Sequence, residues 1–177
     1  WFLKSRQPPG STHGITLCPF AGLLRSARMR VLYGLIALAV VLSLGHHIDH
    51  VIRGNNVGWP VDPEVNAFTY SLAIYLLILV GLILHRAGKV GPGFWAFLSG
   101  GGALFLAVIH FAPDAIEPPS EIIEPYDAAA FGWLAFAWLV VFVGVLVFTF
   151  AYELRLRRQA RAQDRSPKTT RPGGAPG

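Results

Sequence analysis

Four long apolar blocks, joined by short polar segments, constrain this chain more than any other feature of its sequence. They cover about residues 31–52, 67–85, 94–112 and 128–152. A bilayer core about 30 Å thick requires roughly 20 apolar residues of helix, which each block supplies. None alternates polar and apolar residues as a barrel strand would, and backbone groups cannot stay unpaired in lipid. We therefore predict an all-α integral membrane protein with four antiparallel transmembrane helices in an up-and-down bundle.

The composition agrees with a membrane protein and excludes several other classes. Hydrophobic residues make up 53% of the chain and charged residues 14%, whereas soluble domains carry about 25% charged residues. The single cysteine, Cys18, excludes a disulfide framework and a cysteine-rich zinc site. The sequence contains no nucleic-acid-binding motif, so we expect no nucleic-acid partner and attribute the net charge of +5 to membrane topology.

The two ends of the chain differ from the four-span domain, which we place at residues 29–160. The only methionine is Met29, and an apolar run follows it. We interpret residues 1–28 as an N-terminal extension outside the fold. Residues 161–177 are rich in Arg, Pro and Gly, and we expect a disordered basic tail.

The first block has a second interpretation, as a cleaved signal peptide. The apolar run Val31–Leu42 and the small-residue segment Ser43–Gly45 resemble such a leader. Cleavage would leave His46 as the first residue and three spans. The uncleaved helix has the right length to cross the membrane, so both interpretations stay open.

Basic residues predict the orientation of the spans. They lie before the first block, between the second and third, and after the fourth, and Arg53 is the single exception. The connection over residues 112–128 contains five acidic residues and no Lys or Arg. The positive-inside rule therefore places both termini and the short middle loop in the cytoplasm. The short loops and the Arg/Ala/Gly-rich composition favour a bacterial inner (plasma) membrane, with the lipid bilayer as the first partner.

A cluster of titratable residues ends the first block. Three histidines and one aspartate lie within five consecutive positions: His46, His47, Asp49 and His50. At about 100° per residue, His46, Asp49 and His50 share one helix face, and the i,i+4 spacing of the two histidines lets both imidazoles reach one ion. Asp49 would ligate the ion or orient an imidazole. His47 points about a quarter turn away and is a secondary candidate.

The third block brings a further histidine to the same end of the bundle. His110 follows a stripe of small residues, Ser99, Ala103 and Ala107. Small residues let membrane helices approach closely, so the stripe should face the bundle and bring His110 to His46 and His50. Asp114 lies four residues beyond His110 and is another secondary candidate. The fourth block has its own stripe, from which we expect close packing: Ala130, Ala137, Gly144 and Ala151.

Three function classes follow, and whether the protein is an enzyme stays open. In a membrane metalloprotein, His46, His50, His110 and Asp49 would hold a transition metal ion such as Zn, Cu or Fe, since imidazole and carboxylate groups suit all three. Haem held between one histidine of the first block and His110 is a less favoured form of this class. In a small transporter or proton-relay subunit, the same cluster would carry protons. In a noncatalytic subunit, the small-residue faces would bind a membrane-protein partner or a second copy of the chain.

Overall fold

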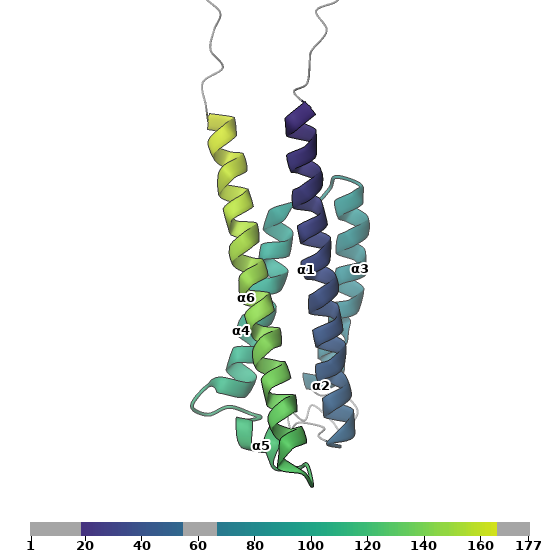
Figure 1. Cartoon of the computed structure of the whole chain (residues 1–177), viewed down its shortest axis with the longest axis vertical. Helices are drawn as coiled ribbons and strands as arrows, with labels where there is room; N and C mark the ends of the chain where they lie inside the picture. Colours follow the sequence, from purple (N-terminus) through teal and green to yellow (C-terminus); the bar gives the residue numbers. More distant parts are fainter. Residues whose placement is uncertain (1–18, 55–66, 166–177) are drawn as a thin grey trace, which may run out of the picture.

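The computed structural model describes residues 19–54 and 67–165, and within those ranges its helices are joined by turns and connections, without strands. Four helical segments are long and apolar enough to cross a membrane, and they pack side by side in alternating directions (Figure 1). This confirms the predicted all-α fold of four transmembrane helices. The elements are α1 (Pro19–Ile52), α2 (Ala67–Ser71), α3 (Ala73–Arg86), α4 (Pro92–Phe111), α5 (Pro119–Ile123) and α6 (Ala129–Arg165).

Helices α1 and α6 are longer than the apolar blocks that define them. With 34 and 37 residues, they are about 51 and 55 Å long, and both extend beyond α3 and α4 at one end of the bundle (Figure 1). Helix α1 begins at Pro19, inside the expected extension, and α6 ends at Arg165, inside the expected tail. Residues 1–18 and 166–177 lie outside the described part of the chain.

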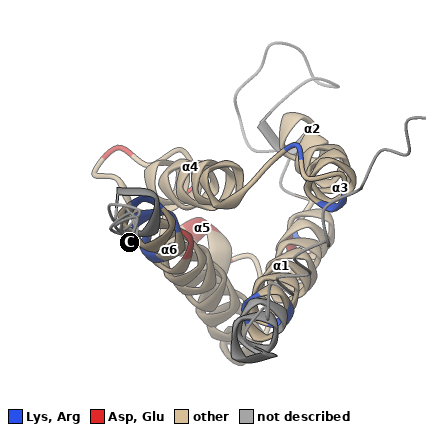
Figure 2. Cartoon of the chain, turned by 90° about the horizontal axis from the view of Figure 1, so that it is seen from above, with Lys and Arg blue, Asp and Glu red and all other residues tan. Residues whose placement is uncertain are grey.

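The two ends of the bundle differ in charge. We call the end that holds the turn after α3, with Arg86 and Lys89, the basic end. The opposite end holds α5 and the acidic connection after α4, and we call it the acidic end; Figure 2 shows Asp and Glu at α5 and along that connection. His46, His50 and His110 all lie at the acidic end, in the last turns of α1 and α4.

The second span consists of two helices. Helix α2 ends at Ser71 and α3 begins at Ala73, so the break lies at Leu72. A turn bond from the Tyr75 amide to the Leu72 carbonyl, 3.3 Å long, bridges the break. Ser71, the residue before the break, is hydrogen-bonded to His47 of α1.

Helices α1, α4 and α6 enclose the main apolar core. Its buried members include Leu42 on α1, Leu106 on α4 and Leu139 on α6. Gly45 allows α6 to approach α1, because a Cβ atom there would lie 2.6 Å from the rigid Trp138 ring. The indole Nε1 of Trp138 donates a 2.8 Å hydrogen bond to the Leu42 carbonyl, which fixes this crossing.

The small-residue stripes have different outcomes. On α4, Ser99 and Ala103 are buried as expected. On α6, the expected close packing is wrong within this chain: the four stripe residues, Ala130, Ala137, Gly144 and Ala151, are all exposed. Large side chains on another face of α6, including Leu139 and Phe142, make its contacts with the bundle. Residue size alone therefore did not identify the packed face of α6.

Candidate metal centre

Three histidines from two helices meet at the acidic end, as expected from the sequence. Each can offer one imidazole nitrogen such that the three atoms lie within 4.8 Å of one another. The Nε2 atoms of His46 and His50 are 3.2 Å apart, and the His46 and His110 ring centroids are 5.2 Å apart. His46 is 6% exposed, His50 9% and His110 1%. We call His46, His50 and His110 the His triad.

The spacing of the His triad matches that of nitrogen ligands around one small cation. Zinc–nitrogen bonds of 2.0–2.1 Å in a tetrahedron place neighbouring ligand atoms about 3.3 Å apart. The 3.2 Å separation of the His46 and His50 nitrogens is close to that value. The i,i+4 spacing on a regular helix produces this geometry, so α1 holds two imidazoles in place without any loop.

Glu117 lies against the His triad and is completely buried. Its amide donates a 3.0 Å hydrogen bond to the Ile109 carbonyl, which folds the connection after α4 back over the end of that helix. The Nδ1 atom of His110 donates to the Glu117 carbonyl at 3.1 Å and lies 3.3 Å from its Oε2. A carbonyl only accepts, so Nδ1 carries the proton and Nε2 keeps the lone pair that a metal would use. The Glu117 Oε2 atom is also 3.5 Å from Nε2 of His50.

Arg53 joins the acidic connection to α1. Its Nη1 donates to Oε1 of Glu117 at 2.6 Å, and its Nε donates to Oδ2 of Asp49 at 2.9 Å. Burial acts to lower the pKa of Arg53, but the bond to Asp49 and the charge of Glu117 outweigh it, so that pKa is raised. Burial also raises the pKa of Glu117, and Arg53 opposes the rise. This ion pair therefore holds Glu117 against the His triad.

Asp49 is not among the residues whose ligand atoms come together, and its link to the His triad is indirect. Its carboxylate accepts hydrogen bonds from Arg53 and from the Tyr126 hydroxyl. Burial, followed by the interaction with Asp49, raises the pKa of Tyr126 to about 12. Asp49 thus connects α1 to the segment before α6 and reaches the His triad through Arg53 and Glu117.

The two secondary candidates lie elsewhere. His47 faces α2 and α3: its Nδ1 donates to the Ser43 carbonyl at 2.8 Å, and its Nε2 accepts from the Ser71 hydroxyl at 2.8 Å. The Tyr75 hydroxyl is also 2.8 Å from Nδ1 of His47. Asp114 is exposed on the connection after α4. Neither belongs to the group of residues whose ligand atoms come together.

The sequence analysis did not identify Glu117 as part of the site. It was one of five acidic residues in a connection without basic residues, and nothing in its spacing distinguished it. The useful signal was Arg53, the lone basic residue at this end, because a buried guanidinium requires acidic partners. Asp49 was one candidate partner, four residues away, and Glu117 is the other.

The arrangement of the rings disfavours haem. Two axial histidines must lie on opposite faces of a macrocycle, but the His46 ring lies edge-on to both His50 and His110, at centroid distances of 4.6 and 5.2 Å. To place a flat macrocycle between two of these histidines, their rings would have to move apart. The three nitrogens, within 4.8 Å of one another, could hold a single ion without separation of the rings.

Comparisons with protein families, with curated proteins and with solved structures find no match to this chain. The fold and the site therefore define its class by themselves. It is a multi-pass helical membrane protein with a partly buried His46/His50/His110 cluster that could hold a metal ion.

Proposed function

We propose that the protein is a membrane metalloprotein that binds one transition metal ion through the His triad. The convergence of three imidazole nitrogens within 4.8 Å, on two different helices, is the observation that carries this proposal. Ionisable residues inside a membrane span are costly and tend to mark function. A bound ion offsets that cost, since the imidazoles then coordinate instead of remaining partly desolvated.

Glu117 completes the proposed site. Through its carbonyl and Oε2 it orients His110, and Oε2 is close enough to His50 to serve as an oxygen ligand. Asp49, the ligand or orienting residue expected from the sequence, would act through Arg53. Three imidazoles and one carboxylate suit Zn²⁺, Cu²⁺ or Fe²⁺.

The proposed ion would have an open coordination position on the side away from Glu117. All three members of the His triad line a cavity between the helices. Catalytic metal sites keep a position for water or substrate in this way, and zinc in such sites can expand to five ligands, which allows a further molecule beside Glu117. We therefore favour a site that binds a further molecule over a purely structural ion.

The charge pattern supports an orientation for this site. With the basic end in the cytoplasm of a bacterial inner membrane, the His triad lies in the outer leaflet. Cysteine substituted at Ser120, on α5, should react with an impermeant thiol reagent added to intact cells. Cysteine at Gly88, after α3, should react only after permeabilisation. The reverse pattern would overturn this orientation.

Metal analysis of the purified full chain tests the proposal. After loading with Zn²⁺, Cu²⁺ or Fe²⁺ and removal of free ions, we expect about one ion per chain for one of them. His46→Ala, His50→Ala and His110→Ala should each remove most of it, because two imidazoles rarely hold an ion alone. His47→Ala is the matched control and should retain it. Wild-type protein that binds none of the three ions, or triad variants with unchanged content, would overturn the proposal.

A proton relay is the second candidate, favoured by a specific contact. His46 and His50 are hydrogen-bonded through their Nε2 atoms, and Glu117 is adjacent to both His50 and His110. Such a chain can pass protons when no metal displaces them. Proton flux into liposomes that persists in metal-free protein and is lost in the His50→Ala variant would favour the relay over the metal site.

A further inference from the structure

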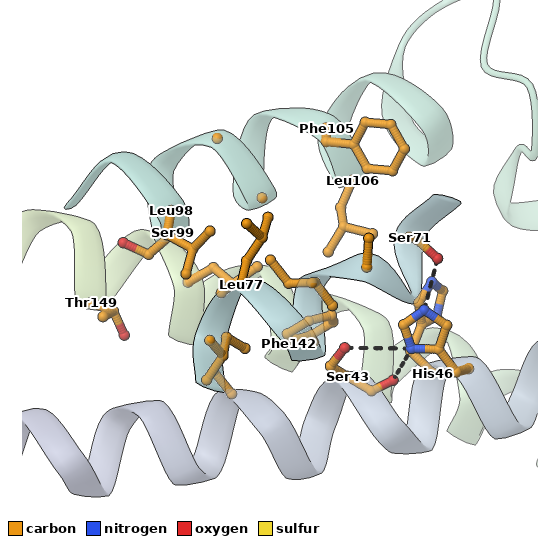
Figure 3. Close-up of a pocket in the computed structure, with 18 of the residues that line it drawn as sticks. Ser43, His46, Ser71, Leu77, Leu98, Ser99, Phe105, Leu106, Phe142 and Thr149 are labelled. Atoms are coloured by element: carbon orange, nitrogen blue, oxygen red, sulfur yellow. Dashed lines mark hydrogen bonds between the residues drawn. The ribbon is translucent and has the colours of Figure 1, made fainter. Parts of the chain in front are cut away.

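A long cavity leads from the His triad into the depth of the bundle. Its volume is 430 Å³, within the range of about 300–1,000 Å³ that holds small ligands. Helices α1, α3, α4 and α6 all contribute to its walls (Figure 3). It extends along α1 from Ile36 to His50 and along α4 from Trp95 to His110.

The two ends of the cavity differ chemically. At the acidic end, the His triad lies beside Ser71 and Tyr70 of α2. The middle is lined by apolar side chains such as Leu77, Leu106 and Phe142 (Figure 3). The cavity is therefore polar at one end and apolar along the rest of its length.

The hydroxyl groups in the deep part of the cavity do not change this character. The Ser99 hydroxyl donates to the Trp95 carbonyl at 2.7 Å. The Thr149 hydroxyl donates to the Val145 carbonyl, also at 2.7 Å. Each is satisfied by its own helix, so the deep part presents few polar groups to a bound molecule.

The side of the cavity opens toward lipid between α3 and α4. Several of its lining residues also belong to the exposed surface of the bundle at membrane depth. Leu77 on α3 is 50% exposed, and on α4 Phe97 is 77% and Phe105 42% exposed. Farther toward the basic end the opening closes, because the Phe94 ring of α4 packs against Gly81 of α3. A membrane-dissolved molecule can therefore enter sideways without crossing water.

The length of the cavity indicates a chain-like occupant. The fourteen residue steps from Ile36 to His50 correspond to about 21 Å, and the lining stretch of α4 gives about 22 Å. An extended hydrocarbon chain advances about 1.25 Å per carbon, as a zigzag of 1.52 Å bonds requires. The cavity thus matches a chain of about 16 carbons. A volume of 430 Å³ spread over this length makes a narrow cleft.

We infer that this cleft binds a single-chain lipid with a carboxylate head, a fatty acid of about 16 carbons. The tail lies between α3 and α4, and the head group occupies the open position of the metal ion. Placement of the head group rests on the proposed metal site. Among the buried groups of the site, the charges of a divalent ion and of Arg53 exceed those of the two carboxylates Asp49 and Glu117, which favours an anion at the ion. Placement of the tail depends only on the cleft.

A photoreactive palmitic acid with a diazirine near the end of its tail tests the inference on the full chain in detergent. We expect crosslinks on residues that line the deep part of the cleft, such as Leu98 and Leu146. Unlabelled palmitic acid should compete at least tenfold better than octanoic acid, whose tail is too short to fill the cleft. Equal competition by the two acids, or crosslinks restricted to other faces of the bundle, would overturn the inference.

A pair of glycines provides matched variants. Gly101 lines the cleft, and a Cβ atom there would meet nothing within 4 Å, so Gly101→Phe can place a ring at the opening from a backbone position that tolerates a side chain. Gly144 on α6 is equally open but does not line the cleft. We expect Gly101→Phe to reduce crosslinking at least tenfold with metal content unchanged, and Gly144→Phe to change neither. Similar crosslinking in the two variants would contradict the assignment.

The two proposals can fail separately. If the wild-type chain binds no metal but crosslinking remains sensitive to Gly101→Phe, the cleft assignment is supported and coordination of the head group is overturned. If metal binds and palmitic acid competes no better than octanoic acid, the metal site is supported and the lipid assignment is overturned.

Discussion

Helices α3 and α4 are similar in hydropathy but have very different surroundings. Of the apolar stretches that could cross the membrane, 39% of the α4 stretch is buried inside the bundle but only 6% of Thr69–Arg86, which is mostly α3. Helix α4 packs along α6 and supplies His110, whereas α3 leaves most of its surface to lipid. Apolar length therefore indicates that a helix crosses the membrane, and says little about its contacts with other helices.

The attachments of α3 explain its position. Toward the basic end, the Phe94 ring of α4 packs against Gly81, where there is no room for a side chain. At the acidic end, His47 of α1 contacts Ser71 and Tyr75 by hydrogen bonds. Between these two points α3 borders the cavity. It is held at both ends and forms a wall of the cleft, while α1, α4 and α6 form the framework.

Substitution of Leu139 on α6 should have the largest effect on stability. This side chain is 1% exposed in the core of the framework, and Leu139→Ala should lower the free energy of unfolding by about 2–4 kcal/mol through lost packing. Leu77→Ala on α3, where the leucine is 50% exposed, should cost less than about 0.5 kcal/mol. Unfolding in increasing SDS measures both. Equal losses would show that α3 is as integral to the bundle as α6.

Glu117 tests whether the acidic connection belongs to the site. Glu117→Ala removes the carboxylate beside His110 and His50 but keeps the carbonyl, so metal affinity should fall by about 10–100-fold. Glu121→Ala is the control, because that side chain is exposed on α5, four residues after Glu117. Competition with a metal-binding dye measures the affinities. Equal affinities of the two variants would remove Glu117 from the site.

His47 tests the attachment of α3 with the smallest expected effect. His47→Phe removes the hydrogen bonds to Ser71 and Tyr75 and should cost about 1 kcal/mol. Backbone amides of α2 and the first turn of α3 should exchange hydrogen faster, while those of α4 and the metal content stay unchanged. Faster exchange throughout the bundle would mean that His47 supports the whole fold.

The number, order and antiparallel packing of the spans were predictable from the sequence, but the ends of the helices were not. Apolar residues indicate only the part of a helix that lies in lipid, and not where the helix begins or ends. Beyond Tyr152, α6 continues through Leu, Arg, Gln and Ala, which are good helix formers in water. The expected tail therefore begins with helix up to Arg165.

The His triad was predictable because helix geometry determines it. A rotation of 100° per residue pairs His46 with His50, and the stripe on α4 directed His110 toward them. Glu117 was not predictable, since its position depends on a loop that folds back onto Ile109 and on an ion pair with Arg53, 64 residues away. The small-residue stripe on α6 is a regular pattern that was predictable from the sequence, but it faces away from the bundle.

His110 lies 60 residues after His50 in the sequence, so the three histidines are synthesised and inserted into the membrane at different times. His46 and His50 emerge early in synthesis, and His110 follows only after two further spans. Until α4 inserts, the first helix exposes two imidazoles to lipid or to the insertion machinery, with no third nitrogen beside them. The three histidines come together only after the third of the four spans has inserted, so an ion that requires all of them would be acquired late in biogenesis.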